Sequence, residues 1–264
     1  MIIEVRRVAS HYIKLAGQLP AGFKNVFTET KDSLVLRKLR YADKPLSRRQ
    51  EILLKKNSEA LSKLFLFAIV QTVPVAGWIP IIVALNYPRF LLTDHFWSID
   101  QKTEFKLDEF IERRQHCVEL RDHIASQFPS AESSTFRTVG MSSSLDALPS
   151  KYIKLLAGAN AIHGNIITQK ISPTFITSYL MKRNAEFICK DDALLRSEGL
   201  DDLSEMELQD ALLQRGFNSV SIDSPEYVLD NKKCLEHWLE MQQLTPACRA
   251  SYLLHSIAIH EIWK

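Results

Sequence analysis

Asp94 and His95 are adjacent in the stretch NYPRFLLTDHFW (residues 86–97), and a carboxylate beside an imidazole can serve general acid–base chemistry. Such chemistry also needs a nucleophile or a bound metal held at a defined distance from the imidazole. No serine or cysteine nucleophile accompanies this pair at a spacing that the sequence fixes. We therefore interpret Asp94 and His95 as a solvated pair at an interface and predict no catalytic role for them.

Other combinations of titratable residues fail for similar reasons. His116 and Cys117 are adjacent, so on a helix they point about 100° apart and cannot chelate one ion. His116 and His123 could share a helix face, but two histidines alone make a poor metal site. The four cysteines contain no C-x-x-C pair, and the phosphate-binding, nucleophile-elbow, dinucleotide and H-E-x-x-H motifs are all missing. The sequence thus predicts a protein that is not an enzyme and holds no metal or cofactor.

Charge is distributed unevenly along the 264 residues, although the net charge is only +2. Residues 1–63 hold 14 basic and 6 acidic side chains, whereas residues 197–240 hold 3 basic and 11 acidic ones. The first segment should favour acidic lipid headgroups or RNA, and the second should repel them. The N-terminal stretch does not fit a secretory signal, and with Glu4 and few serines it matches a mitochondrial presequence only weakly.

A long apolar run covers residues 64–85, where 22 consecutive residues carry no charge. As a helix it would extend about 33 Å, enough to cross a hydrocarbon core of about 30 Å. Basic and aromatic side chains flank it, as expected for anchors at the lipid headgroups. These predicted membrane-interface residues are Lys63, Tyr87, Arg89, His95, Phe96 and Trp97. The sequence therefore predicts a transmembrane helix with the lipid bilayer as a partner.

Pro74 and Pro80 complicate this prediction, because each removes a backbone donor near the middle of the run. A kinked span tolerates them, but two alternatives stay open. One is a re-entrant hairpin that turns around residues 75–77, and the other is a buried helical hairpin of a soluble protein.

Helix signals occur on both sides of the run, and no stretch alternates in the manner of a strand. Ser47, Ser98 and Ser204 each precede a Gln or Glu by three residues, which predicts a capping box at each serine. The helices that begin at these three serines should run to the membrane, to about residue 126, and to Arg215-Gly216, respectively. Further helices are expected at 173–184, at 191–198 ending before Gly199, from Asp230 to Gln243, and from Thr245-Pro246 with Leu254, Ile257 and Ala258 on one stripe.

The predicted class is therefore all-α: a proline-kinked transmembrane helix or hairpin followed by a C-terminal bundle of short helices. We expect five regions in the chain. These are a basic helical region (1–63), a membrane segment with its interfacial exit (64–97), a charged helix (98–126), a Ser/Thr-rich linker (127–150) and a helical domain (151–264).

Within the helical domain, the helix–extension–helix pattern at residues 203–241 is similar to short DNA-binding modules. The acidic excess of that segment argues against DNA, since affinity for duplexes comes largely from neutralised phosphates. If RNA binds, the expected surface is basic and lies elsewhere in the domain. Its candidate residues are Lys151, Lys154, Lys170, Lys182 and Arg183.

Three blocks in this order resemble the LETM family of mitochondrial inner-membrane proteins, and more closely its short LETM-domain-containing branch. The first two blocks are Leu46-Ser47-Arg48-Arg49, and Tyr87-Pro88-Arg89-Phe90-Leu91-Leu92 with His95-Phe96-Trp97. The third, in the family's ribosome-binding-like domain, comprises Gly199-Leu200, Leu203-Ser204, Glu207-Leu208, Arg215-Gly216, Asn218 and Trp238-Leu239. From this last block we add Arg215 and Asn218 to the candidate ribosome- or RNA-binding residues.

The resemblance implies a protein anchored in the mitochondrial inner membrane with a helical domain in the matrix. It implies docking of mitochondrial ribosomes or assembly factors to support respiratory-chain biogenesis, or alternatively a part in K⁺/H⁺ or Ca²⁺/H⁺ exchange. A homo-oligomer is compatible with either. This chain differs from long family members: we expect no coiled coil after Lys264 and no EF-hand calcium loop. The basic flank at 37–63 favours a matrix-side N-terminal segment, and a hairpin would reconcile that with a matrix C-terminal domain.

Overall fold

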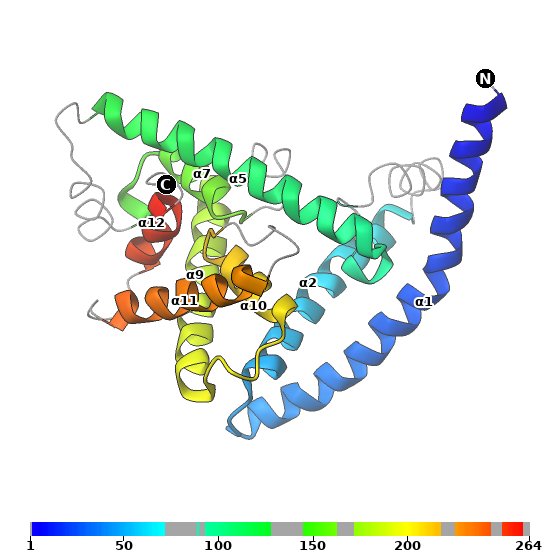
Figure 1. The fold of residues 1–264 in the computed structure, drawn as a ribbon, viewed down its shortest axis with the longest axis horizontal. Coiled ribbons are helices and arrows are strands. Elements are labelled where there is room, and N and C mark those ends of the chain that lie inside the picture. The colour runs from blue at the N-terminus through cyan, green and yellow to red at the C-terminus, as the bar shows by residue number, and fades with distance from the viewer. Residues whose placement is uncertain are drawn as a thin grey trace. The chain divides into compact units, whose positions relative to one another are not determined.

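The computed structural model describes residues 2–71, 89, 93–127, 145–162, 172–217, 225–243 and 250–260, and most of these are helical (Figure 1). No strand occurs among these residues, which confirms the all-α class. In chain order, the helices are α1 (Ile2–Tyr41), α2 (Arg48–Gln71), α5 (Ile99–Gln127), α7 (Ser150–Ala159), α9 (Thr174–Glu198), α10 (Glu205–Gln214), α11 (Pro225–Gln243) and α12 (Ala250–His260). The 3₁₀ helices η1 (Asp94–Phe96) and η2 (Leu145–Ala147) join them.

None of the described helices combines the length and the apolar composition needed to cross a bilayer. The first part of the predicted span belongs to α2, which ends at Gln71. The remainder of that span, residues 72–85, lies outside the described residues, as does most of the predicted linker. The transmembrane helix that we predicted is thus not found in the described part of the chain.

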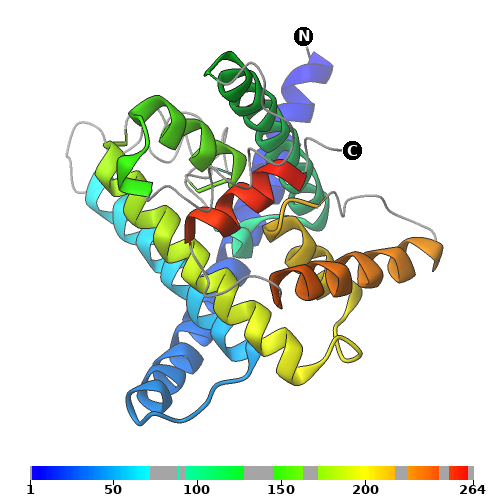
Figure 2. The same cartoon turned by 90° about the vertical axis from the view of Figure 1, so that its left-hand side faces the viewer.

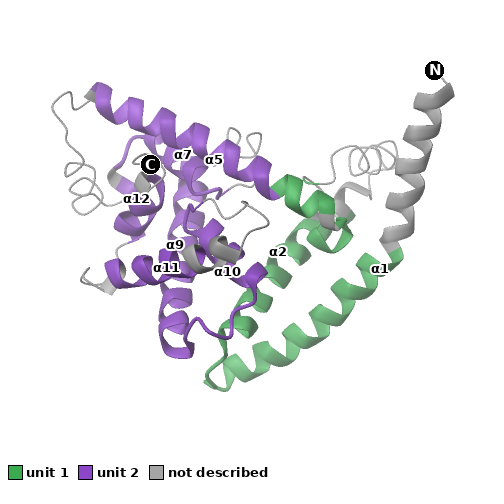
Figure 3. Cartoon of the chain, in the orientation of Figure 1, with its two compact units in different colours: residues 1–105 green, residues 106–264 purple. Residues whose placement is uncertain are grey.

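The chain divides into two compact units, residues 1–105 and 106–264 (Figure 3). In the first unit, α1 and α2 pack against each other as a helical hairpin. Leu36, Leu46 and Leu54 form a small apolar core there. Beside it, the buried hydroxyl of Ser33 donates to Asn57 Oδ1 at 2.7 Å. This bond between the two helices satisfies polar groups that would otherwise be costly to bury.

All three predicted capping boxes are present. In each, the serine N–H donates to a Gln or Glu side chain three residues later, and that residue's N–H donates back to the serine hydroxyl. The pairs are Ser47 with Gln50, Ser98 with Gln101, and Ser204 with Glu207. Gly199 and Gly216, with φ of 83° and 85°, follow α9 and α10 where the sequence predicted their ends.

Two other boundaries differ from the prediction. We expected separate helices at 173–184 and 191–198, but α9 is continuous, because buried residues recur at helical spacing through Ala185 and Ile188. We expected Asp230 to cap a helix, but α11 begins at Pro225 and Asp230 lies inside it. Proline suits the first helical position, where its missing N–H has no intrahelical partner to lose.

The second unit has one continuous apolar core. α9 packs against α7 and α12, and α10 packs against α11 (Figure 2). Fully buried residues come from each of these helices, including Leu156, Met181, Leu212, Leu235 and Leu254. Ile257 and Ala258 are also buried, which confirms the stripe predicted for the last helix. This packing fixes which face of α9 points inward and which faces outward.

Candidate functional site

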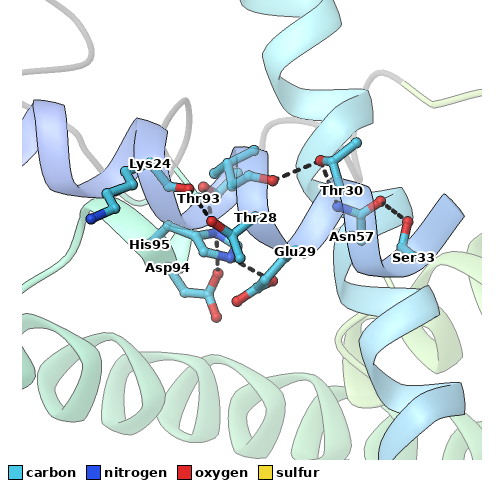
Figure 4. Close-up of polar contacts among 10 residues, drawn as sticks. Lys24, Thr28, Glu29, Thr30, Ser33, Asn57, Thr93, Asp94 and His95 are labelled. Atoms are coloured by element: carbon cyan, nitrogen blue, oxygen red, sulfur yellow. Dashed lines mark hydrogen bonds and ion pairs between the residues drawn. The ribbon is translucent and has the colours of Figure 1, made fainter. Parts of the chain in front are cut away.

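Polar groups from two separate segments of the first unit hold His95 (Figure 4). Its Nε2 lies 2.8 Å from Glu29 Oε2 on α1, while its Nδ1 lies 3.1 Å from Thr93 Oγ1 and 3.2 Å from Asp94 Oδ1. The imidazole is only 8% exposed. The prediction of a solvated pair is therefore wrong for His95, because η1 turns the ring inward onto α1.

Thr93, His95 and Glu29 form the sequence hydroxyl, imidazole and carboxylate that nucleophilic catalysis uses. The search for a nucleophile considered serine and cysteine and so missed this threonine. Thr93 is buried, however, so its hydroxyl cannot reach a substrate while the turn stays folded. The arrangement fits a structural link between η1 and α1 better than a catalytic centre.

Phe96 strengthens the same link. Its buried ring packs edge-on against Phe23 of α1, with the ring centroids 5.1 Å apart. It also fills the space in front of Gly22, where any side chain would collide with the ring. His95 and Phe96 were predicted as membrane-interface residues, and in the structure both face α1, where polar and apolar contacts bury them.

The remaining predicted interface residues are placed differently. Lys63 is exposed on α2, with its ammonium nitrogen 5.9 Å from the centroid of the Trp97 ring. Trp97 packs edge-on against Phe105 of α5, with the ring centroids 4.9 Å apart, so it seats the following helix. Arg89 is half-buried, and Tyr87 lies outside the described residues.

Arg215, a predicted ribosome- or RNA-contacting residue, lies in the interior of the second unit with no exposed surface. Its guanidinium donates to Asp191 at 2.7 Å and to Asp192 at 2.5 and 3.0 Å. Trp238 Nε1 also donates to Asp192, at 3.3 Å. Burial alone would lower the pKa of Arg215, but Asp192 and Asp191 outweigh it and hold that pKa above its usual value.

This ionic cluster therefore joins α9, α10 and α11 from inside, and Arg215 is removed from the candidate binding surface. The Arg-Gly pair of the third sequence block gains a structural explanation: the arginine anchors the end of α10, and the glycine supplies the left-handed turn after it. Asn218 lies outside the described residues.

The predicted basic surface is brought together on α7 and α9. Lys151 and Arg183 are exposed, and Lys154 is half-buried. Lys182 forms an ion pair with Asp146 at 2.6 Å. α7 and α9 pack together, and the hydroxyls of Ser150 and Thr174 meet at 2.7 Å where the two helices begin. Lys170 lies outside the described residues.

The sequence analysis missed two aromatic residues on the same face of α9. Phe175 is 74% exposed and Tyr179 is 62% exposed. They lie four residues apart, so they are neighbours on the helix surface, and Arg183 continues the row. Helical spacing could have identified them, because both residues fall outside the buried stripe through Thr177, Met181 and Ala185.

No cluster of three or more metal-binding side chains occurs among the described residues, His116 and His123 included.

A further buried histidine, His255, links α12 to α7. His255 Nδ1 donates to the carbonyl of Ser251 at 2.6 Å, and Nε2 accepts from the Tyr152 hydroxyl at 2.8 Å. Burial lowers the pKa of His255, against the opposing effect of the Ser251 carbonyl, and burial raises the pKa of Tyr152.

The depressed pKa of His255 predicts acid sensitivity of the second unit. The contribution of neutral His255 to folding stability is fully present above the pKa of histidine in the unfolded chain, about 6.5. This contribution is lost as the pH falls below that pKa, because His255 then takes up a proton in the unfolded state but not in the folded state. Stability should fall by up to about 1.4 kcal/mol for each pH unit below that value. Thermal unfolding between pH 7 and pH 5 measures this in wild type and in His255→Gln, whose profile should be flatter; equal slopes would contradict the assignment.

Comparisons with known proteins agree with the sequence blocks. A family model described as "LETM1-like, RBD" matches residues 46–143 and 139–259. LETM1 domain-containing protein 1 of Xenopus tropicalis is 25% identical over 214 residues, covering 72% of this chain and 59% of the relative. The Homo sapiens protein of the same name is 22% identical over 227 residues, covering 78% and 62%. The chain thus spans about three-fifths of each relative's length. No solved structure matches.

Proposed function

This chain belongs to the LETM1-like RBD family, and from that premise we propose that it is a non-catalytic scaffold at the mitochondrial inner membrane. Its second unit, residues 106–264, binds the mitochondrial ribosome or factors that assemble with it, in support of respiratory-chain biogenesis. The observation that carries the proposal is the family match, which extends over most of the chain and takes in α7, α9, α10, α11 and α12.

The outward face of α7 and α9 supports ribosome binding. Residues 150–159 and 174–185 contain no acidic residue, and Lys151 and Arg183 are exposed there, while Lys182 is paired with Asp146 of η2. A ribosome is rich in RNA phosphates, and lysines and arginines that neutralise them provide most of the affinity that does not depend on sequence. Segment 197–240 of the same unit is unsuited to this role, because it is strongly acidic.

The uncharged sequence at 72–85 supports the membrane part of the proposal. Together with residues 64–71 it is long enough to cross a hydrocarbon core, and the basic side chains before it suit acidic headgroups. A scaffold of this kind would hold a ribosome close to the membrane through one chain, with the first unit next to the bilayer. This arrangement requires no catalytic residue, which agrees with the buried hydroxyl of Thr93.

The proposal predicts salt-sensitive association of the full chain with mitochondrial ribosomes. In detergent extracts, the chain should pellet with ribosomes at about 50 mM salt, and its affinity for them should fall at least about tenfold at about 200 mM salt. Neutralising only a few phosphates already gives a salt dependence of this size. Sedimentation through a sucrose cushion, with the chain alone as the control, measures the bound fraction. Failure to pellet at low salt would overturn the proposed function.

A further inference from the structure

α9 presents an exposed row of side chains that the packing of the second unit does not use. Phe175, Tyr179 and Arg183 follow one another at intervals of four residues on the face opposite Thr177 and Met181, which are buried. Glu186, one turn later, is the first acidic residue of the helix and marks the end of the row. A solvent-facing row of two aromatic rings and an arginine has no role in the core.

Lys151 is exposed at the start of α7, close to the start of this row. The bond between Ser150 and Thr174 fixes the start of α7 beside the start of α9, so Lys151 and Phe175 each directly follow a linked residue. Neither helix start has a side-chain cap at its proline N-cap, and helix N-termini carry a positive partial charge. The occupant of this face should therefore be anionic and should also offer flat apolar surfaces.

We propose that the face formed by Lys151, Phe175, Tyr179 and Arg183 binds a single-stranded segment of RNA. Phe175 and Tyr179 stack on bases, while Lys151 and Arg183 contact the neighbouring phosphates. This rests on the proposed function, and it names the chemical nature of the ribosomal partner at this face.

The spacing of the rings suits nucleobases. Four helical residues rise about 6 Å, close to twice the about 3.4 Å separation of stacked bases, so one base fits between the Phe175 and Tyr179 rings. Stacking on aromatic side chains tolerates any base, because every base has a flat π-face. Duplex RNA keeps its bases stacked on one another, so the face should prefer unpaired strands.

A lipid surface fits these observations less well. An interfacial helix lays a long apolar face on the bilayer, whereas the apolar face of α9 is inside the unit and its exposed row ends after two turns in charged residues. The arginine and the lysine beside the rings match phosphates spaced along a strand. Binding to vesicles is therefore an outcome that would contradict the proposal.

Fluorescence anisotropy of a labelled, unstructured RNA of about 15 nucleotides, titrated with the full chain in detergent micelles, tests the proposal. Phe175→Ala with Tyr179→Ala should weaken binding by about tenfold or more, as expected for the loss of base stacking. The conservative pair Phe175→Tyr and Tyr179→Phe should retain it. Met206→Ala, an exposed apolar residue on α10, is the matched control and should leave binding unchanged. Arg183→Glu should weaken binding and lower its salt dependence.

Several outcomes would overturn the RNA assignment. Three of them concern RNA: no RNA binding at low salt, equal binding by the double-alanine variant, or equal competition by duplex RNA. The fourth concerns lipid: the chain floats with phosphatidylcholine–phosphatidylglycerol vesicles only when both rings are present, while its RNA binding does not depend on the rings. Because the rings are exposed, unchanged thermal unfolding should accompany the alanine variants. If those variants still pellet with ribosomes, the RNA assignment falls and ribosome binding through another surface stands.

Discussion

Replacing Arg215 with alanine is expected to lower the free energy of unfolding of the second unit by about 3–5 kcal/mol. The guanidinium is wholly buried, and its loss leaves the carboxylates of Asp191 and Asp192 in the interior without their cation. It also removes a bond to the carbonyl of Ala211. Thermal unfolding and hydrogen exchange of the amides in α9 and α10 measure the effect.

The matched control for this change is Arg183→Ala, which removes an exposed arginine from the same unit and should cost little. A second substitution, Asp192→Ala in the Arg215→Ala background, should recover part of the lost stability, since it removes a buried charge that has become unpaired. If Arg215→Ala costs no more than the control, the ionic cluster does not hold the unit together.

Replacing Gly22 with valine is expected to detach Phe96 from α1 and to cost the first unit about 2–4 kcal/mol. A Cβ at position 22 would lie 2.3 Å from Phe96 Cδ1, far inside van der Waals contact. The ring is buried, so it must leave its site and lose about 1.5–3 kcal/mol of burial, with further strain in the neighbouring contacts. Hydrogen exchange at residues 93–105, together with thermal unfolding, reports the displacement.

Ala21→Val is the control for this substitution, because Ala21 is exposed on the same turn of α1. Phe96→Ala should also destabilise the unit, and the combination with Gly22→Val should cost clearly less than the two effects added together, since both break one contact. Additive effects would show that the ring and the glycine act independently.

The helix ends were largely predictable because their signals are local. A serine with Gln or Glu three residues later, and a glycine after the last apolar position, act within one helical turn, and the structure places them as expected at Ser47, Ser98, Ser204, Gly199 and Gly216. The continuity of α9 was missed, because the first predicted helix ended near residue 184 and the next began at Asp191. Asp191 and Asp192 are in fact buried partners of Arg215.

The placement of the candidate site residues depended on contacts between distant segments, which one sequence does not reveal. Arg215 was assigned to a binding surface from the family resemblance alone, and its carboxylate partners lie 23 and 24 residues earlier on another helix. His95 was assigned to an interface because it follows the apolar run, while its partner Glu29 is 66 residues away. By contrast, the outward position of Phe175 and Tyr179 follows from their spacing against the buried stripe of α9, and both lie within the helix that was predicted at 173–184.

Ribosome pelleting with charge-reversed variants tests the central claim most directly, because it asks whether this chain binds the ribosome through the face on α7 and α9. At about 50 mM salt, the full wild-type chain should pellet with mitochondrial ribosomes, and Lys151→Glu with Arg183→Glu should lower the affinity about tenfold or more. Lys233→Glu, an exposed change within the acidic segment, should pellet like wild type. Equal pelleting of all three chains, or none by the wild type, would contradict the account.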